Sequence, residues 1–272
     1  MEFLVIIFVI IILVSYLLQI HNYENSDYYK DTHKGYFEVL SDKGDYGEYV
    51  LSRKLEYFED KGQLFRNCYV PLSNGQTTEL DIVLIDEKGI FVIESKNYAG
   101  WIFGGEDQQK WTQCLRSRRG SQKHSFYNPI RQNKTHINAL SRYLQISPDC
   151  IYSIIAFSDK CEFKHLELTS NKHKVIHQSQ LGYTIDCLRN QSSIQFTQTQ
   201  MDYYKQQLSK LKDKRIQEQA RHVQFVKNHD SGNTCPYCNG KLVLRTVKNG
   251  PRAGSHFYGC ENYPRCHYTR NI

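Results

Sequence analysis

The first twenty residues of the chain almost entirely lack charge. Glu2 is the one charged residue there, and residues 3–20 carry none. As a helix, this apolar-dominated run reaches about 27 Å, close to the hydrocarbon thickness of a bilayer. No small-x-small cleavage site follows and no basic residue precedes it, which argues against the alternative of a cleaved signal peptide. We therefore predict a transmembrane helix over residues 1–20.

Basic residues are absent before this run but appear after it, at Lys30, Lys34 and Lys43. Positive residues favour the cytoplasmic side of a membrane. We therefore expect a single-pass protein of the cytoplasmic (inner) membrane. Residues 21–40 would form a juxtamembrane linker, and the C-terminal domains would lie in the cytoplasm.

Closely spaced cysteines are missing from the first 200 residues. Five of the nine cysteines stand singly there, and four are clustered near the C-terminus. This distribution does not fit the disulfide framework of a secreted protein, but it fits reduced thiols plus one metal site. It independently favours a cytoplasmic location for most of the chain.

A basic excess is also missing from the first 200 residues. Residues 201–272 contain 13 Lys and Arg against 5 Asp and Glu, so the total of +7 leaves residues 1–200 at −1. A charge imbalance confined to one end favours contact with a polyanion, either nucleic acid or anionic lipid. The alternative is a solvated helix face.

The central part of the 272-residue chain, residues 41–190, has the pattern of a mixed α/β domain. Helical spacing of apolar residues and a proline at a helix start predict helices. Runs rich in β-branched and aromatic residues predict strands. The expected helices cover residues 44–61 and 130–144, and the expected strands cover 64–70, 79–85, 90–95, a run near Trp111 and 151–157.

The hairpin over residues 79–97 is the most informative segment. If Glu87 and Lys88 form a two-residue tip, Asp81 lies directly opposite Glu94, with their β-carbons about 5 Å apart. Lys96 shares the face of Glu94 because side chains two apart along a strand point the same way. The flanking residues are apolar, so we expect both strands to be central in their sheet.

Two unpaired carboxylates buried side by side are costly without a cation. Mg²⁺ or Mn²⁺ favours such oxygen ligands. Lys96 is then placed to hold or deprotonate a water that attacks a phosphodiester. The structural alternative is a Glu94–Lys96 pair at a strand end, with Asp81 capping a turn.

The spacing of Asp81, Glu94 and Lys96 resembles the PD-(D/E)xK nuclease motif, with Leu80 in the variable position before Asp81. The surrounding residues resemble the nuclease-related domain (NERD) family over residues 41–144. The matching residues are Gly44-Asp45-Tyr46-Gly47-Glu48, Thr78-Glu79-Leu80-Asp81, Phe91-Val92-Ile93-Glu94-Ser95-Lys96-Asn97, and Asn128-Pro129 followed by Gln132 and His136. The resemblance implies a restriction-endonuclease-like fold, a mixed sheet flanked by helices.

The same resemblance implies roles for individual residues. Asp81 and Glu94 would bind the divalent cation, with the Ser95 carbonyl as a further ligand and Lys96 as the water-activating group. Glu48 would be the third carboxylate.

The alternative for Glu48 is simple charge complementarity at a helix N-terminus. Gln132 would lie near the catalytic centre, with His136 one helical turn later. A lone helical histidine is more often only packed or solvated.

The residues between the central domain and the C-terminal module are polar and basic. Residues 191–231 are expected to form a helical spacer, whose apolar stripe is too broken for a coiled coil. Within the central domain, residues 104–125 combine basic residues with Trp101 and Trp111 nearby, which suits phosphate and base contacts. A solvent-exposed hairpin is the alternative for this segment.

The four clustered cysteines are Cys235, Cys238, Cys260 and Cys266. Two close cysteine pairs separated by a β-rich stretch can close a tetrahedral Zn²⁺ site, whose binding would be coupled to folding of this small module. Residues 232–272 resemble the Cys₄ zinc finger of bacterial type IA topoisomerases, which binds single-stranded DNA.

That resemblance implies a small β zinc-ribbon domain with DNA, in single-stranded form, as its partner. Exposed aromatic and basic residues would stack on bases and neutralise phosphates. At least Phe257 or Tyr258 is expected in the small core instead. The candidate nucleic-acid-binding residues are Tyr237, Lys241, Arg245, Lys248, Arg252, Tyr258, Tyr263 and Arg265.

These patterns together predict a membrane-anchored, metal-dependent DNA endonuclease with a zinc finger that holds DNA. A non-catalytic, membrane-tethered DNA-binding scaffold is the alternative from another class. An RNA nuclease is the alternative among enzymes, and only the resemblance of the finger favours DNA over RNA.

Overall fold

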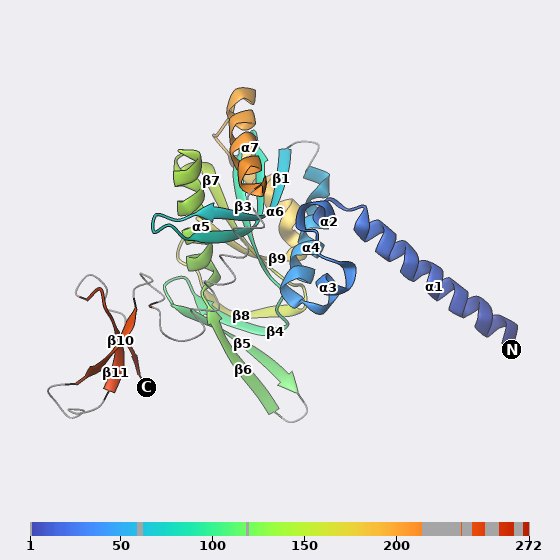
Figure 1. Cartoon of the computed structure of the whole chain (residues 1–272), viewed down its shortest axis with the longest axis horizontal. Coiled ribbons are helices and arrows are strands. Elements are labelled where there is room, and N and C mark those ends of the chain that lie inside the picture. The colour runs from blue at the N-terminus through green and yellow to red at the C-terminus, as the bar shows by residue number, and fades with distance from the viewer. Residues whose placement is uncertain are drawn as a thin grey trace. The chain divides into compact units, whose positions relative to one another are not determined.

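The computed structural model describes residues 2–58, 62–117, 120–213, 235, 241–247, 256–263 and 269–271. The chain forms two compact units, Met1–Asp213 and Lys214–Ile272. The two units are described separately below. The first unit contains the predicted α/β domain (Figure 1).

A five-stranded mixed sheet forms the centre of the first unit. Its order is β1-β2-β3-β7-β9, with antiparallel pairing among the first three strands and parallel pairing of β3 with β7 and β7 with β9. β2 and β3 are therefore interior strands, as expected. The strands are β1 (Gly62–Pro71), β2 (Thr77–Asp86), β3 (Gly89–Lys96), β7 (Ile151–Phe157) and β9 (His173–His177).

Helices cover both faces of this sheet. On one face, Val83 and Val92 pack in a buried cluster with α5 (Pro129–Leu144) and α7 (Gln198–Asp213). On the other face, Ile82 and Ile93 pack with α4 (Lys43–Leu55), the short helix η1 (Glu56–Phe58) and α6 (Leu181–Gln191). The predicted mixed sheet flanked by helices is confirmed.

A second, four-stranded sheet of order β6-β5-β4-β8 extends the domain beyond the end of β3. Trp111 is fully buried against Ile155 and Phe157 of β7 and joins the two sheets. Trp111 is therefore a core residue and offers no surface for stacking on bases. The strands are β4 (Gly100–Gly105), β5 (Lys110–Ser117), β6 (Gly120–Tyr127) and β8 (Cys161–Glu167).

The β5–β6 hairpin is the outer part of this second sheet, and β6 is almost entirely exposed. The segment expected from sequence to suit phosphate and base contacts is thus an antiparallel hairpin whose inner strand β5 buries Trp111 and Cys114 and whose outer strand β6 is exposed. Two further short helices, η2 (Pro148–Cys150) and η3 (Gln178–Gln180), precede β7 and α6. Arg118 and Arg119 lie outside the described residues.

The N-terminal helix α1 (Glu2–Glu24) has an apolar surface. Among the described residues it is the one helix long and apolar enough to cross a membrane, with a mean hydropathy of 3.0. Its large apolar side chains, such as Phe3 and Leu17, are exposed. This exposure is what the side chains of a lipid-facing helix would show.

The segment after α1 folds onto the α/β domain, although the sequence suggested a linker. It forms α2 (Asp27–Thr32) and α3 (Tyr36–Ser41), and Tyr23, Tyr28 and Val39 are buried together. Asp31 and Arg66 of β1 form a buried ion pair with a 2.9 Å contact. Aromatic packing and this ion pair hold the segment in place.

The segment expected to be a spacer also contributes to the core. The described part of it, α7, buries Tyr204, Leu208 and Leu211 together with Phe196. The apolar stripe, too broken for a coiled coil, instead faces the sheet. Residues 214–231 lie outside the described part of the chain.

The second unit contains a small antiparallel sheet of order β10-β11-β12. Its strands are β10 (Leu242–Thr246), β11 (His256–Cys260) and β12 (Thr269–Asn271). Leu242 packs with Cys235 and Cys260 in a buried cluster. The predicted small β domain is confirmed.

Candidate functional site

The β2–β3 hairpin has the register predicted from the sequence. Asp86 pairs with Gly89 and Ile82 pairs with Ile93, so the tip consists of two residues and Asp81 and Glu94 come next along the two strands. The Ser95 backbone N–H donates to Asp81 Oδ2 at 2.7 Å. The two carboxylates therefore lie at adjacent positions where the hairpin ends.

Lys96 connects this pair of acids to α5. Its Nζ donates to Glu94 Oε1 at 2.5 Å and to Gln132 Oε1 at 3.1 Å. His136 is buried, and its Nδ1 lies 3.2 Å from Glu94 Oε2. Both helix residues proposed from sequence, Gln132 and His136, thus reach the Glu94–Lys96 pair.

Asn128 explains why α5 begins where these two side chains can reach the sheet. Its Oδ1 accepts from the Ile130 N–H at 2.9 Å, which caps the helix ahead of Pro129. Its Nδ2 donates to the carbonyl groups of the preceding β4–β5 turn at 2.6–3.1 Å. One buried amide therefore fixes the helix start to the second sheet.

Glu48 approaches from α4 on the other side. It lies in the second turn of the helix, while Asp45 occupies the first turn, so helix-terminal charge complementarity does not explain Glu48. A β-carbon at Gly47 would lie 2.7 Å from the Asn97 β-carbon. Glycine at this position lets α4 pack closely against the end of β3, which brings Glu48 toward the cluster.

Three residues around Glu48 were not assigned a role from the sequence. Asn67 Nδ2 donates to Glu48 Oε2 at 2.8 Å and to Glu79 Oε1 at 3.1 Å. The Tyr28 hydroxyl from α2 lies 3.5 Å from Glu48 Oε2. The sequence could have pointed to Asn67, because it is a polar residue within an otherwise apolar strand. Nothing in the sequence points to Tyr28, because its contact with Glu48 depends on the tertiary fold.

Asn67 also marks a local distortion of the sheet. It has a φ of 50°, which is uncommon for a residue other than glycine and costs on the order of 1 kcal/mol or more. Its neighbours Arg66 and Cys68 pair with Ile82 and Leu80, so Asn67 lies opposite Asp81. The strained residue is therefore directly across from a candidate metal ligand.

The pKa values of the three carboxyl groups shift in different directions. Burial and the neighbouring Glu94 raise the pKa of Asp81 well above its usual value. Burial and Glu79 raise the pKa of Glu48 to about 7, despite the opposing hydrogen bond from Asn67. Burial would also raise the pKa of Glu94, but Lys96 and His136 outweigh it and the pKa is lowered.

A divalent cation fits this donor set. Asp81 and Glu94 supply two carboxylates, and the raised pKa of Asp81 shows that a further positive charge would be stabilised there. Within the described residues, no three acidic, histidine or cysteine side chains are arranged as a ready-made metal cage. Mg²⁺ commonly takes one or two carboxylates and keeps several waters, so two suffice.

In the second unit, the described part of the cysteine cluster is compatible with a zinc site. Cys235 and Cys260 are buried in the same cluster. The Asn262 N–H donates to Cys260 Sγ at 3.4 Å, a contact that suits a thiolate ligand. Cys238 and Cys266 lie outside the described residues.

The candidate nucleic-acid-binding residues of this unit differ in exposure. Tyr263 is 59% exposed, and the Arg245 guanidinium lies 5.7 Å from its ring centroid. Lys241 is exposed, whereas Tyr258 packs against the cysteine cluster, as was expected for one of the two aromatic residues. Tyr237, Lys248, Arg252 and Arg265 lie outside the described residues.

The mixed sheet and the cysteine-bearing β unit fit a DNA-binding, nuclease-like protein with a zinc ribbon, and two family matches support this class. Residues 43–158 match the family model described as nuclease-related domain (NERD), and residues 232–272 match the topoisomerase DNA-binding C4 zinc finger. The chain belongs to the nuclease-related domain family and carries a topoisomerase-type zinc finger.

Two relatives illustrate these two parts. The uncharacterized protein pXO1-01 of Bacillus anthracis is 32% identical over 189 residues, which cover 68% of this chain and 84% of that protein. The uncharacterized protein YrdD of Escherichia coli K12 is 43% identical over 47 residues, which cover 17% of this chain and 22% of that protein. No solved structure matches the chain.

Proposed function

We propose that the protein is a membrane-anchored, metal-dependent DNA endonuclease. The observation that carries this proposal is the convergence of Asp81, Glu94 and Lys96 at the end of the β2–β3 hairpin, with Gln132 hydrogen-bonded to Lys96. The arrangement unites cation ligands with a basic group on interior strands. Such a cluster suits phosphodiester hydrolysis better than structural support.

The residues have distinct roles in this proposal. Asp81 and Glu94 hold Mg²⁺ or Mn²⁺, with the Ser95 carbonyl as a further ligand and Glu48 as an additional carboxylate. The bound cation would stabilise the charge that develops on the scissile phosphate. Gln132 acts on Lys96 by holding its ammonium group in place.

Lys96 itself acts as a charged donor. Burial would lower its pKa, but Glu94 and Asp81 outweigh burial and the pKa is raised above its ordinary value. The ammonium group therefore stays protonated at neutral pH and donates hydrogen bonds to the attacking water or to a phosphate oxygen. His136 Nδ1 lies 3.2 Å from Glu94 Oε2, the carboxylate oxygen that Lys96 does not contact.

The other parts of the chain would bring the catalytic site to the membrane and to DNA. The apolar helix α1 would anchor the protein in the cytoplasmic membrane, with both units on the cytoplasmic side. The zinc finger would hold DNA through Tyr263, Arg245 and Lys241. We propose the domain boundaries of the sequence analysis, with the addition that residues 21–40 and α7 pack on the nuclease domain.

A substrate panel tests this function. The detergent-solubilised full chain would be incubated with circular DNA, linear DNA, single-stranded DNA and RNA, in Mg²⁺ or in EDTA. Metal-dependent cutting of DNA is the expected result. Cutting of RNA alone would replace the DNA assignment, and DNA binding without any cutting would favour the non-catalytic scaffold.

A further inference from the structure

A cleft beside the candidate catalytic site is lined mostly by residues that have no role in the chemistry described above. Its volume is about 870 Å³. The start of α4 contributes Lys43 and Tyr46 to the walls, the β5–β6 hairpin contributes His124, and the β7–β8 turn contributes Lys160. Ser95 and Lys96 belong both to the lining of this Lys43–Lys160 cleft and to the candidate catalytic site, so whatever occupies the cleft lies next to the reacting atoms.

The cleft has uncompensated positive charge. No aspartate or glutamate is among its lining residues. Lys43 and Lys160 form no ion pair with any carboxylate of the described residues, in contrast to Lys34 and Lys54, which pair with Asp45 and Asp159. An anionic ligand is therefore favoured there.

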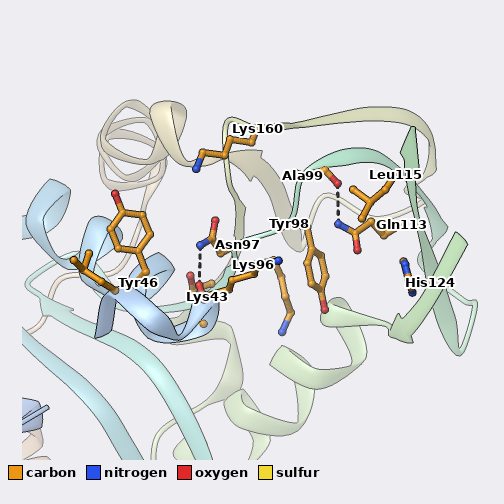
Figure 2. Close-up of a pocket in the computed structure, with 13 residues that line it drawn as sticks. Lys43, Tyr46, Lys96, Asn97, Tyr98, Ala99, Gln113, Leu115, His124 and Lys160 are labelled. Atoms are coloured by element: carbon orange, nitrogen blue, oxygen red, sulfur yellow. Dashed lines mark hydrogen bonds between the residues drawn. The ribbon is translucent and has the colours of Figure 1, made fainter. Parts of the chain in front are cut away.

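The walls of the cleft are held in place without a ligand. Asn97 Nδ2 donates to the Lys43 carbonyl at 2.7 Å, which ties the start of α4 to the end of β3. Gln113 Nε2 donates to the Ala99 carbonyl at 2.8 Å, and the Tyr98 ring packs 4.6 Å from that of Phe126. Figure 2 shows Tyr46 and His124 on opposite sides of the cleft, with Lys96 and Tyr98 between them.

The size and chemistry of the cleft suit a short stretch of one nucleic-acid strand. Its volume is typical of a pocket that encloses a small molecule, roughly 300–1,000 Å³, so it takes one or two nucleotides rather than a duplex. The Tyr46 and His124 rings offer faces for stacking on bases. Lys43 and Lys160 offer ammonium groups for the phosphates.

We propose that the Lys43–Lys160 cleft binds the nucleotides that flank the scissile phosphate on a single DNA strand. Lys43 and Lys160 neutralise the flanking phosphates, and Tyr46 and His124 contact the bases. This inference rests on the proposed nuclease function and names the form of DNA that its site takes.

The first test is kinetic and uses the full chain with single-stranded DNA in Mg²⁺. The double variant Lys43→Gln, Lys160→Gln is expected to raise KM on the order of tenfold, with kcat changed less than twofold. The slope of log KM against log salt concentration should fall by about 1.4, since each phosphate contact on a single strand contributes about 0.7. The matched control is Lys172→Gln, Lys210→Gln, two exposed lysines away from the cleft, which should match the wild type.

The second test does not require cleavage. Single-stranded DNA containing 5-iodouracil would be irradiated with the full chain, and the crosslinked peptides identified by mass spectrometry. We expect adducts at Tyr46 or His124 that are lost in the double variant. The exposed Tyr57 and Tyr183, outside the cleft, serve as internal controls.

The outcomes separate this inference from the proposed function. Unchanged kinetics in the double variant, with adducts only outside the cleft, would overturn the inference while leaving a nuclease. Adducts in the cleft without any cleavage would retain the binding site and reject the nuclease. Duplex DNA cut as efficiently, with the same dependence on Lys43 and Lys160, would overturn the assignment to a single strand.

Discussion

At the scale of single residues, the candidate site lies where the regular alternation of β1 breaks. Phe65 and Cys68 face the same buried cluster, although residues three positions apart on a regular strand point to opposite faces. Asn67, with its positive φ, lies in this interruption opposite Asp81. Backbone strain of this kind is retained where the surrounding structure enforces it, often at functional sites. Here its effect is to place one amide between two carboxylates.

The residues that could be predicted from sequence are those set by local spacing. The placement of Asp81, Glu94 and Lys96 follows from strand periodicity and a two-residue turn. Gln132 and His136 came from the resemblance to the nuclease-related domain family. Tyr28 escaped prediction because its contact with Glu48 depends on the docking of α2. Glu79 was recognised only as part of the Thr78–Asp81 motif, and its contact with Asn67 depends on the pairing of β1 with β2. Trp111 was misjudged because burial cannot be read from residue type alone.

The raised pKa of Glu48 predicts a pH-dependent stability. Because burial raises this pKa from 4.5 to about 7, the folded protein binds the proton more tightly than the unfolded chain. The resulting stabilisation is full below about pH 4.5 and is lost as the pH rises through about 7. In EDTA, Glu48→Gln should therefore gain stability over the wild type between pH 5 and pH 8.5, by up to roughly 3 kcal/mol.

Unfolding followed by tryptophan fluorescence measures this effect. The chain has two tryptophans, Trp101 and Trp111, and both lie in the first unit, so the signal reports that unit alone. If the free energy of unfolding changed with pH in the same way in the wild type and in Glu48→Gln, the pKa of Glu48 would not be raised by burial.

At the scale of elements, the segment between α1 and α4 is part of the domain. The sequence suggested a linker there because its helices are short and its aromatic residues lack a clear period. The structure instead buries Tyr23 and Tyr28 and pairs Asp31 with Arg66. Element types with strong periodicity, such as α5 and the β2–β3 hairpin, were predicted well. Elements stabilised by long-range contacts, such as α2, α3 and β9, were not.

The buried Asp31–Arg66 pair predicts a large effect of a small substitution. Asp31→Asn removes the charge that compensates buried Arg66 and should destabilise the first unit by about 3 kcal/mol or more. Asp27→Asn on the same helix breaks an exposed pair with Lys30 and should cost less than about 1 kcal/mol. Denaturant unfolding compares the two variants, and equal effects would mean that α2 is not docked on β1.

The close packing of α4 against β3 predicts an effect of Gly47. In Gly47→Ala the added β-carbon would meet that of Asn97, so we expect a loss of roughly 1–3 kcal/mol and reduced cleavage as Glu48 moves. Gly182→Ala in α6 has room and should be neutral or more stable by up to about 1 kcal/mol. Thermal unfolding and cleavage rates check both variants. An unaffected Gly47→Ala protein would contradict the packing of α4 described here.

At the scale of the whole molecule, the chain combines a nuclease-like unit and a zinc-ribbon unit that are separately compact. Four clustered cysteines and a helix-strand pattern predicted this division. The sequence could not show that residues up to Asp213 belong to the first unit. That boundary depends on Leu208 and Leu211 packing against the sheet.

This division predicts that zinc affects the two units differently. Cys235→Ser should lower the zinc content and the affinity for single-stranded DNA, because a domain this small depends on its metal to fold. Tryptophan fluorescence of the first unit should not change. Metal analysis, DNA-binding titration and fluorescence give the three readings, and joint unfolding of both units would contradict their independence.

The central claim is that Asp81 and Glu94 form a cation site for DNA cleavage, and one comparison tests it most directly. The full chain, Asp81→Asn and the exposed control Asp202→Asn would be assayed for cutting of single-stranded DNA in Mg²⁺ and in EDTA. Cutting should require Mg²⁺, fall at least about 100-fold in Asp81→Asn and remain unchanged in Asp202→Asn. Equal cutting by all three proteins, or cutting in EDTA, would contradict a cation site at Asp81 and Glu94.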